Sequence, residues 1–394
     1  MLSLPVVNGP RPMPAVSGPA VLALGFRPFF LLGSWYGVLT VLVWVAIFLG
    51  WLSFRPGLSP MLWHGHEMLF GFTAAIIAGF LLTAVPNWTG IPTPRGALLG
   101  GLVALWLLGR GLILSSAVPA ILAAAVDLAF LPALAAALAY PLVKAGKPHN
   151  LVFLPVLGVF TLSNGLVWAE ALGRPGTAAL GLELGLLCIL QLVALIGGRV
   201  IPFFIRAALP ESPARSWPWV ERLALASLPL VALLEALGLS LGAICWAAAI
   251  PHVARLAGWF DRRLIKVPLL WVLYLGYAWL PVGLALKGWA RLVGASPFPA
   301  LHALTVGCIG VMILGMMARV ALGHTGRALK PPRAVVAAFG LLLLAAVLRT
   351  FGPMLAPGTV WVTSSAVLWA LAFGLYGLVY FPILTRPRID GKPG

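Results

Sequence analysis

Two histidines, a carboxylate and a thioether lie close together in the stretch WHGHEM, residues 63–68. On a regular helix His64, Glu67 and Met68 share one face, because they are three and four positions apart. His66 is rotated from His64 by about 200° at about 3.6 residues per turn. The two imidazoles therefore either serve different partners, or the glycine between them loosens the helix start so that they converge on one ion. Two imidazoles and a thioether are typical ligands of copper or haem iron. Histidines hydrogen-bonded to an interfacial loop are the alternative.

Three further histidines lie in or at the ends of long apolar stretches. His302 opens a stretch whose preceding loop falls on the same side of the membrane as His64 and His66, so a metal or haem site shared by all three is predicted. His324 lies about 33 Å further along the same helix at 1.5 Å per residue. It therefore belongs to a second site on the opposite side or caps a helix end. His252 is expected at a depth close to that of His324. A second hypothesis is therefore that these two histidines ligate one haem from its two sides.

Two arginines fall near the ends of apolar stretches on the side of His324. Arg199 lies in the sequence GGRVIPFF, residues 197–204, and Arg319 in MMARVALGH, residues 316–324. Both are candidates for holding a haem propionate or another anion, because guanidinium binds carboxylate with two parallel hydrogen bonds. The alternative is that each side chain extends to the membrane interface. Asp127, in the middle of a stretch, is expected to be functional or to bond between helices.

The composition excludes a soluble protein. Of 394 residues, 61% are hydrophobic and 9% are charged, whereas soluble domains carry about 25% charged residues. The net charge of +17 does not indicate nucleic-acid binding, because the basic residues are scattered between apolar runs. We expect one membrane domain over residues 1–394, with short tails at 1–20 and 385–394.

Apolar stretches long enough to cross a bilayer recur along the whole chain. They predict an all-α polytopic bundle of about twelve transmembrane helices, since open strands would leave backbone groups unpaired in lipid. The predicted spans are 29–52, 64–85, 96–115, 119–142, 151–172, 179–205, 218–238, 240–258, 268–287, 300–322, 334–350 and 359–383. Two junctions, at 115–119 and 238–241, are short enough that either pair could form a re-entrant hairpin.

Loop charge predicts the orientation. The loops on the side of the two termini carry most of the Lys and Arg residues, which places both termini in the cytoplasm. His64, His66 and His302 then face the outer side. The predicted location is the inner, or cytoplasmic, membrane of a bacterium.

Several stretches resemble the NnrS family of bacterial membrane proteins. They are GFRPFF (25–30), WHGHEMLFGF (63–72), GGRVIPFF (197–204), PLLWVLYLGYAWL (268–280) and HALTVGCIGVMILGMMARVALGHTGR (302–327). The resemblance implies a multi-helix inner-membrane protein that contains haem, of the b type, and copper. It also implies a role in the response to nitric oxide, in nitrosative stress and denitrification. His64, His66, His302 and His324 are the implied metal and haem positions, followed by Arg199, Arg319 and Arg327.

Three functions remain open at this stage. The first is a haem and copper protein that binds nitric oxide or relieves its toxicity. The second is a secondary transporter of a metal, a metal complex or a small anion, in which histidines and arginines line a pathway. The third is a sensor of nitric oxide or an assembly factor without turnover. Redox chemistry on nitric oxide or a related nitrogen species would make the first an enzyme, and no electron donor is indicated.

Overall fold

The computed structural model describes residues 18–53, 58–115, 117–239 and 241–392, and nearly all of this chain is helical. The predicted N-terminal tail, residues 1–20, lies mostly outside the described residues. The elements are η1 (Ala20–Leu22), α1 (Phe26–Phe48), α2 (Pro60–His66), η2 (Glu67–Thr73), α3 (Ala74–Thr89), α4 (Gly96–Leu114), α5 (Ala120–Lys144), α6 (Pro148–Leu151), α7 (Phe153–Ala171), α8 (Ala178–Ala208), α9 (Pro218–Ala236), α10 (Gly242–Trp259), η3 (Arg262–Lys266), α11 (Pro268–Val293), α12 (Phe298–His302), η4 (Ala303–Gly310), α13 (Val311–His324), α14 (Arg333–Leu355) and α15 (Val360–Thr385).

Each of the twelve predicted spans is helical, and ten of the described helices are long and apolar enough to cross a membrane. The two helices outside this set are α9 and α10. Helix α9 contains Glu221, Arg222 and Glu235, and α10 contains His252 and Arg255, which lower their apolar character. Their lengths of 19 and 18 residues still correspond to about 29 and 27 Å. The chain is therefore a polytopic helical membrane protein with ten clear spans and two more polar long helices.

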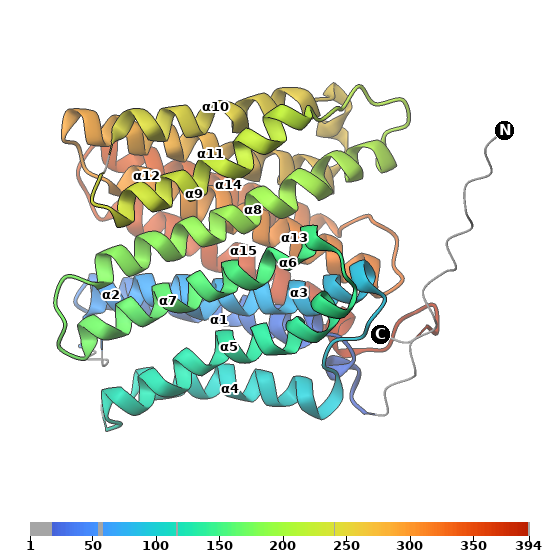
Figure 1. Cartoon of the computed structure of the whole chain (residues 1–394), viewed down its shortest axis with the longest axis horizontal. Helices are drawn as coiled ribbons and strands as arrows, with labels where there is room; N and C mark the ends of the chain where they lie inside the picture. The colour runs from blue at the N-terminus through green and yellow to red at the C-terminus, as the bar shows by residue number, and fades with distance from the viewer. Residues whose placement is uncertain (1–17, 54–57, 116, 240, 393–394) are drawn as a thin grey trace.

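The long helices run side by side in one bundle, and the chain reverses direction at each loop (Figure 1). Helices α9 and α10 extend alongside α8 and α11 (Figure 1). The start of α1 and the end of α15 lie at the same end of the bundle, because Arg27 Nη1 donates to the carbonyl of Arg386 at 2.7 Å. The chain therefore crosses the membrane an even number of times, so α9 and α10 either both cross it or both do not.

Both short junctions separate two long helices. Helix α4 ends at Leu114 and α5 begins at Ala120, while α9 ends at Ala236 and α10 begins at Gly242. The helices of each pair pack against each other over their length. The structure therefore favours two full helices at each junction over a short re-entrant hairpin.

Two central spans contain π-helical segments. In Pro60–Thr89 the segment η2 follows His66 directly, and in Phe298–His324 the segment η4 follows His302 directly. These are the two most buried of the ten spans. A π-helix closes its hydrogen bonds over five residues instead of the four of an α-helix. Such segments are rare in proteins, but those that occur are often at functional sites. The sequence analysis predicted both spans but not this change of helix type, which shifts every later side chain around the helix axis.

Candidate functional site

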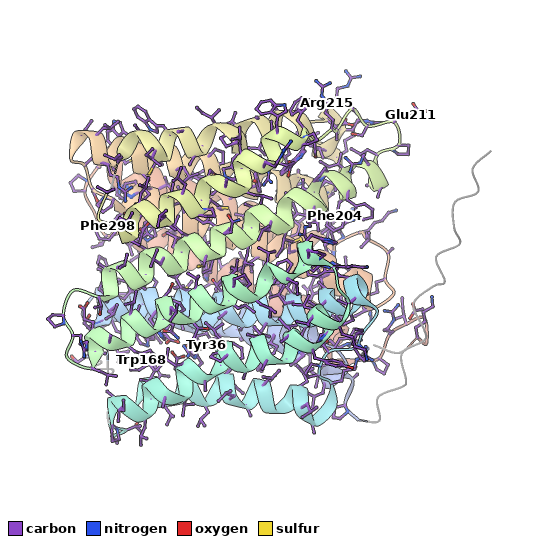
Figure 2. All side chains as sticks on the ribbon, viewed as in Figure 1. Tyr36, Trp168, Phe204, Glu211, Arg215 and Phe298 are labelled. Carbon is purple, nitrogen blue, oxygen red and sulfur yellow. The ribbon has the colours of Figure 1, made fainter. Side chains whose placement is uncertain are left out.

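A buried network of polar side chains surrounds His66 at the start of η2. Its members come from five helical segments, α1, α2 with η2, α4, α5 and α7. We call it the His66 cluster: Tyr36, His66, Glu67, Arg110, Asp127, Asn164 and Trp168. Figure 2 shows Tyr36 and Trp168 in the same half of the bundle.

Both ring nitrogens of His66 are engaged in this cluster. Nδ1 lies 2.7 Å from Glu67 Oε1, and Nε2 lies 2.9 Å from Asn164 Oδ1 and 3.1 Å from Asp127 Oδ2. Asn164 Nδ2 donates to Asp127 Oδ2 at 2.8 Å, which orients the amide so that its oxygen faces the imidazole. His66 is therefore held by oxygen atoms on both sides.

Arg110 joins the two carboxylates of the cluster. Its Nη1 donates to both oxygens of Glu67 at 2.8 Å, and its Nη2 forms an ion pair with Asp127 Oδ1. Tyr36 donates to Glu67 Oε2, and Trp168 Nε1 donates to Asp127 Oδ2 at 2.8 Å. Buried charges are costly unless they are paired and hydrogen-bonded. The cluster meets both conditions and ties α1, η2, α4, α5 and α7 together.

His64 faces away from this cluster. Its ring stacks on Trp44 with centroids 4.5 Å apart and planes inclined by 10°. Its Nδ1 is buried and has no hydrogen-bond partner within the described chain. His64 and His66 therefore have different partners and do not converge on one ion. This is the arrangement expected when the helix stays regular through His66. Met68 Sδ lies 3.8 Å from Thr40 Oγ1 on α1.

His302 lies at the same end of the bundle as His64. Its Nδ1 is 2.7 Å from the carbonyl oxygen of Phe298, which can only accept, so Nδ1 carries the proton and the lone pair is on Nε2. His64 belongs to the first turns of span two, and His302 is the last residue of α12, at the start of span ten. That the two histidines share a site remains a prediction.

The predicted joint site of His64, His66, His302 and Met68 does not form one group. Among the described residues, no three His, Cys, Asp or Glu side chains are grouped to hold a metal ion. His66 belongs to its own cluster, while His64 and His302 lie outside it. We call these two residues the His64–His302 pair.

The opposite end of the bundle holds His324, the last residue of α13. Its ring lies 5.8 Å from the ring of Phe26, and its carbonyl oxygen accepts from Arg388 Nη1 at 2.7 Å. Arg388 also pairs with Asp390, and this guanidinium lowers the pKa of the Asp390 carboxyl well below its usual range. Gly326 has a φ of 74°, which suits glycine at a helix end. The His324 ring thus packs against Phe26, and its role as a ligand or as a helix cap remains a prediction.

The three predicted arginines are each held by protein groups. Arg199 donates to Asn150 Oδ1 at 3.1 Å and to the His149 carbonyl at 2.8 Å. Arg319 lies over the ring of Phe204, 3.6 Å from its centroid, and Figure 2 shows Phe204 toward the end of the bundle away from Trp168. Arg327 Nη1 donates to the Thr325 carbonyl at 3.4 Å, a long hydrogen bond.

His252 lies in a second buried network, far along the chain from the first. Its Nδ1 is 2.8 Å from Tyr277 Oη, and its Nε2 is 3.3 Å from Ser227 Oγ. Arg255 donates to the same phenol at 2.8 Å and pairs with Glu221 at 2.6 Å. No contact joins His252 with His324 in the described structure, so the predicted axial pair is not brought together.

Glycines make room for this second network. A Cβ at Gly198 would lie 3.0 Å from both Arg255 Nη2 and Glu221 Oε2, and one at Gly197 would lie 3.1 Å from the ring of Tyr277. These two residues open the stretch GGRVIPFF. Its glycine pair is therefore explained by close packing of α8 against this network.

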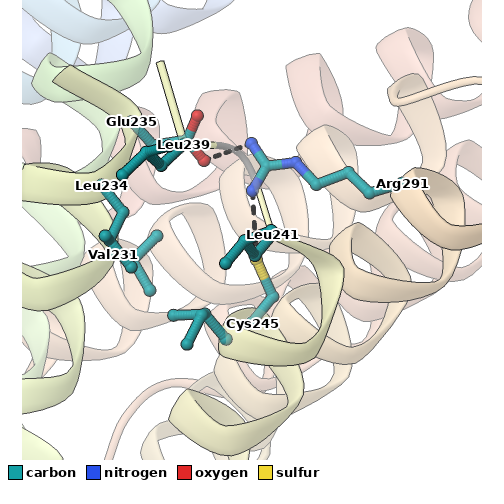
Figure 3. A pocket seen from close by; sticks show the side chains of 8 residues that line it. Val231, Leu234, Glu235, Leu239, Leu241, Cys245 and Arg291 are labelled. Atoms are coloured by element: carbon teal, nitrogen blue, oxygen red, sulfur yellow. Dashed lines mark hydrogen bonds and ion pairs between the residues drawn. The ribbon is translucent and has the colours of Figure 1, made fainter. Parts of the chain in front are cut away.

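A small recess lies between α9, α10 and α11 near the His64–His302 end. It is open on one side, with a total empty volume of about 150 Å³, and is lined by Val231, Leu234, Glu235, Leu239, Leu241, Ile244, Cys245 and Arg291. Arg291 pairs with Glu235 and donates to Cys245 Sγ at 3.3 Å (Figure 3). Since its polar groups bind one another and the other walls are apolar, the recess has no built ligand site.

The sequence analysis missed several members of these sites. Tyr36, Arg110, Asn164 and Trp168 were not chosen. Their signal was present, because each is a polar or ionisable side chain inside an apolar stretch. Asp127 was singled out on that basis, and the structure places it at the centre of the His66 cluster.

Comparison with known families gives one clear result. The family model described as NnrS protein matches residues 20–388, which is nearly the whole chain. Among curated proteins, no sequence matches the chain.

Proposed function

Because the chain belongs to the NnrS family, we propose that it is a haem- and copper-binding membrane protein of the nitric oxide response. His64 and His302 are the imidazole ligands in this proposal. The observation that carries it is the position of these two residues at the same end of the bundle. They come from different spans, His64 from α2 and His302 from α12.

The residues of the pair fit a metal or a haem iron. His64 Nδ1 is buried without a partner. His302 donates from Nδ1 to a backbone carbonyl, the arrangement that fixes the tautomer of a metal-binding histidine and leaves Nε2 to bind. Imidazole is a common ligand of haem iron and of copper, so the two residues would be able to hold either. By contrast, His66 and His252 have both ring nitrogens engaged.

The surrounding residues have supporting roles. A haem iron held by one of these imidazoles would keep a position for a diatomic gas such as nitric oxide, and the other imidazole would then be available to copper. The stack of Trp44 on His64 limits rotation of that ring. The His66 cluster holds the start of η2 against four other helices, and so holds the backbone that carries His64. We place the pair at the outer face of a bacterial inner membrane, with both termini cytoplasmic, on the loop charge.

The test is haem and copper analysis of the detergent-purified protein together with its optical spectrum. We expect a Soret band in the wild type and its loss or strong reduction in His64→Ala and His302→Ala. His149→Ala is the matched control, because His149 is exposed in a short helix at the opposite end and should leave the band unchanged.

Two results would contradict this proposal. One is a Soret band that is the same in both histidine variants and in the wild type. The other is a colourless, metal-free protein that still protects cells from nitric oxide. In the second case a transporter becomes the better hypothesis, because two buried ionisable networks could line a pathway. Uptake into proteoliposomes would measure that activity, and turnover of nitric oxide with a reductant would separate an enzyme from a sensor.

A further inference from the structure

The six tyrosines of this protein differ in what their hydroxyl groups bond to, and all six lie in the described part of the chain. Three donate to backbone carbonyls, one accepts from a lysine and one donates to a carboxylate, namely Tyr274, Tyr376, Tyr380, Tyr140 and Tyr36 in that order. The hydroxyl of the sixth, Tyr277, lies 2.8 Å from His252 Nδ1. Tyr277 is therefore the tyrosine of the six whose phenol faces an imidazole.

The neighbouring groups fix the direction of this hydrogen bond. Arg255 carries only donors, and its Nη1 lies 2.8 Å from Tyr277 Oη, so the phenol oxygen accepts there. The single proton of the phenol then points to His252 Nδ1, which accepts. The ring proton of His252 is on Nε2 and faces Ser227 Oγ at 3.3 Å, and Ser227 donates onward to the Ala224 carbonyl at 2.9 Å. His252 is thus a neutral imidazole whose basic nitrogen is aimed at the phenol.

The pair is enclosed by protein. Tyr277 and His252 are both 0% exposed, and the ring of Trp259 lies edge-on to the Tyr277 ring with centroids 4.9 Å apart. On the side of α8, a Cβ at Gly197 would lie 3.1 Å from two carbons of the Tyr277 ring, so the helix backbone covers that side. With water excluded in this way, the group in position to take the phenol proton is His252.

We propose that Tyr277 is a redox-active residue that gives up one electron while its phenolic proton passes to His252. The O–H bond of Tyr277 breaks, and an N–H bond forms at His252 Nδ1. The electron goes to a one-electron acceptor of the class of an oxidised metal centre, which is reduced. The products are a neutral phenoxyl radical and an imidazolium. A phenol that loses an electron becomes a strong acid, and a base within hydrogen-bond reach can take its proton in the same step.

The network also accommodates the charge that this step creates. The positive charge moves to His252, close to Arg255, and the carboxylate of Glu221 lies 2.6 Å from Arg255 and offsets one of the two positive charges. A buried charge is costly unless it is paired and hydrogen-bonded in this way. Because His252 keeps the proton, reduction of the radical returns it to Tyr277 without any exchange with water.

The position of Tyr277 suits a donor to the metal of the proposed function, and only this part of the inference rests on that function. A Cβ at Gly276, the residue before Tyr277, would lie 3.0 Å from the backbone nitrogen of Met312 on span ten. Met312 is ten residues along the span from His302, or roughly 15 Å at about 1.5 Å per residue. Tyr277 would then supply a single electron to a metal held at His302.

The experiment uses the full-length protein in detergent after removal of metal and haem. The oxidant is ruthenium(III) tris-bipyridine, made by a laser flash in the presence of persulfate, and the radical is followed by transient absorbance and by electron paramagnetic resonance of frozen samples. Every protein carries Tyr140→Phe, because Tyr140 is 61% exposed and would react directly. Into this parent are placed Tyr277→Phe, His252→Gln and, as control, Tyr274→Phe, since the Tyr274 hydroxyl donates to the Leu256 carbonyl, which takes up no proton.

We expect a tyrosyl signal in the parent that is lost in Tyr277→Phe and kept in Tyr274→Phe. Loss of the base in His252→Gln should slow formation of the radical by about a hundredfold or more. In heavy water the parent itself should form the radical more slowly, a readout that depends on the folding of no further variant. An equal signal in Tyr277→Phe and the parent overturns the inference, and so does a rate unchanged both in His252→Gln and in heavy water. Because the protein is stripped, either outcome is independent of the Soret test of the proposed function.

Discussion

Asp127 is the residue whose removal should damage the His66 cluster most. Its carboxylate pairs with Arg110 and accepts from Trp168 Nε1 and Asn164 Nδ2, each at 2.8 Å, and it lies 3.1 Å from His66 Nε2. The substitution Asp127→Ala removes all four contacts at once. It also leaves four buried polar groups, those of Arg110, Trp168, Asn164 and His66, without one of their partners.

The size of the effect can be worked out from these contacts. Removing one partner of a buried ion pair costs about 3–5 kcal/mol. Arg110 keeps Glu67 in the variant, so the low end of about 3 kcal/mol applies. Hydrogen bonds between membrane helices average about 0.6 kcal/mol each, and three are lost. We therefore expect Asp127→Ala to lower the free energy of unfolding by about 4–5 kcal/mol.

The assay is unfolding by sodium dodecyl sulfate in mixed micelles, followed by circular dichroism and tryptophan fluorescence. Ser163→Ala is the matched control, because Ser163 is also buried, on α7 beside Asn164, but bonds only within its own helix, to the Val159 carbonyl. It should change stability by less than about 0.5 kcal/mol. A loss below about 1 kcal/mol in Asp127→Ala, or equal losses in the two variants, would refute the view that the cluster holds these helices together.

Two further predictions concern packing and pH. Gly71→Ala places a Cβ 2.7 Å from Glu67 Oε2, so overpacking should lower the free energy of unfolding by about 1–3 kcal/mol. Gly111→Ala is the control, because the space around its Cβ is open. It should leave the stability unchanged or raise it slightly in the same unfolding assay. At the opposite end, Arg263 holds the pKa of Asp261 below the usual range. The stabilising effect of this contact is therefore fully present well above the ordinary carboxyl pKa of about 3.9, and it is lost progressively as the pH falls from that value to the lower pKa of Asp261 in the folded protein. The thermal midpoint should fall less between pH 5 and 3 in Asp261→Asn than in the wild type, and equal falls would contradict this.

The fold was predictable because lipid allows few solutions. Long apolar stretches separated by short polar loops can only be helices in a bilayer, and all twelve predicted stretches are helical. Their ends shifted by a few residues, as with the first helix, which begins at Phe26 and ends at Phe48 instead of spanning 29–52. Helices α9 and α10 are less apolar in part because they carry Glu221 and Arg255, the charged residues of the network around His252. Hydropathy detects these charges, but it does not show that they pair with each other.

The sequence by itself determined which residues were costly to bury and at which end of a span each one lay, because helix rise and span length convert position into depth. On that basis His64, His66 and His302 were expected to share a site, and Asp127 to be functional or to bond between helices. Only the tertiary structure decided how these residues are grouped. Which faces of the first five spans meet depends on packing in the plane of the membrane, and depth carries no information about that plane. The separation of His66 from His64 therefore became visible only once the helices were assembled.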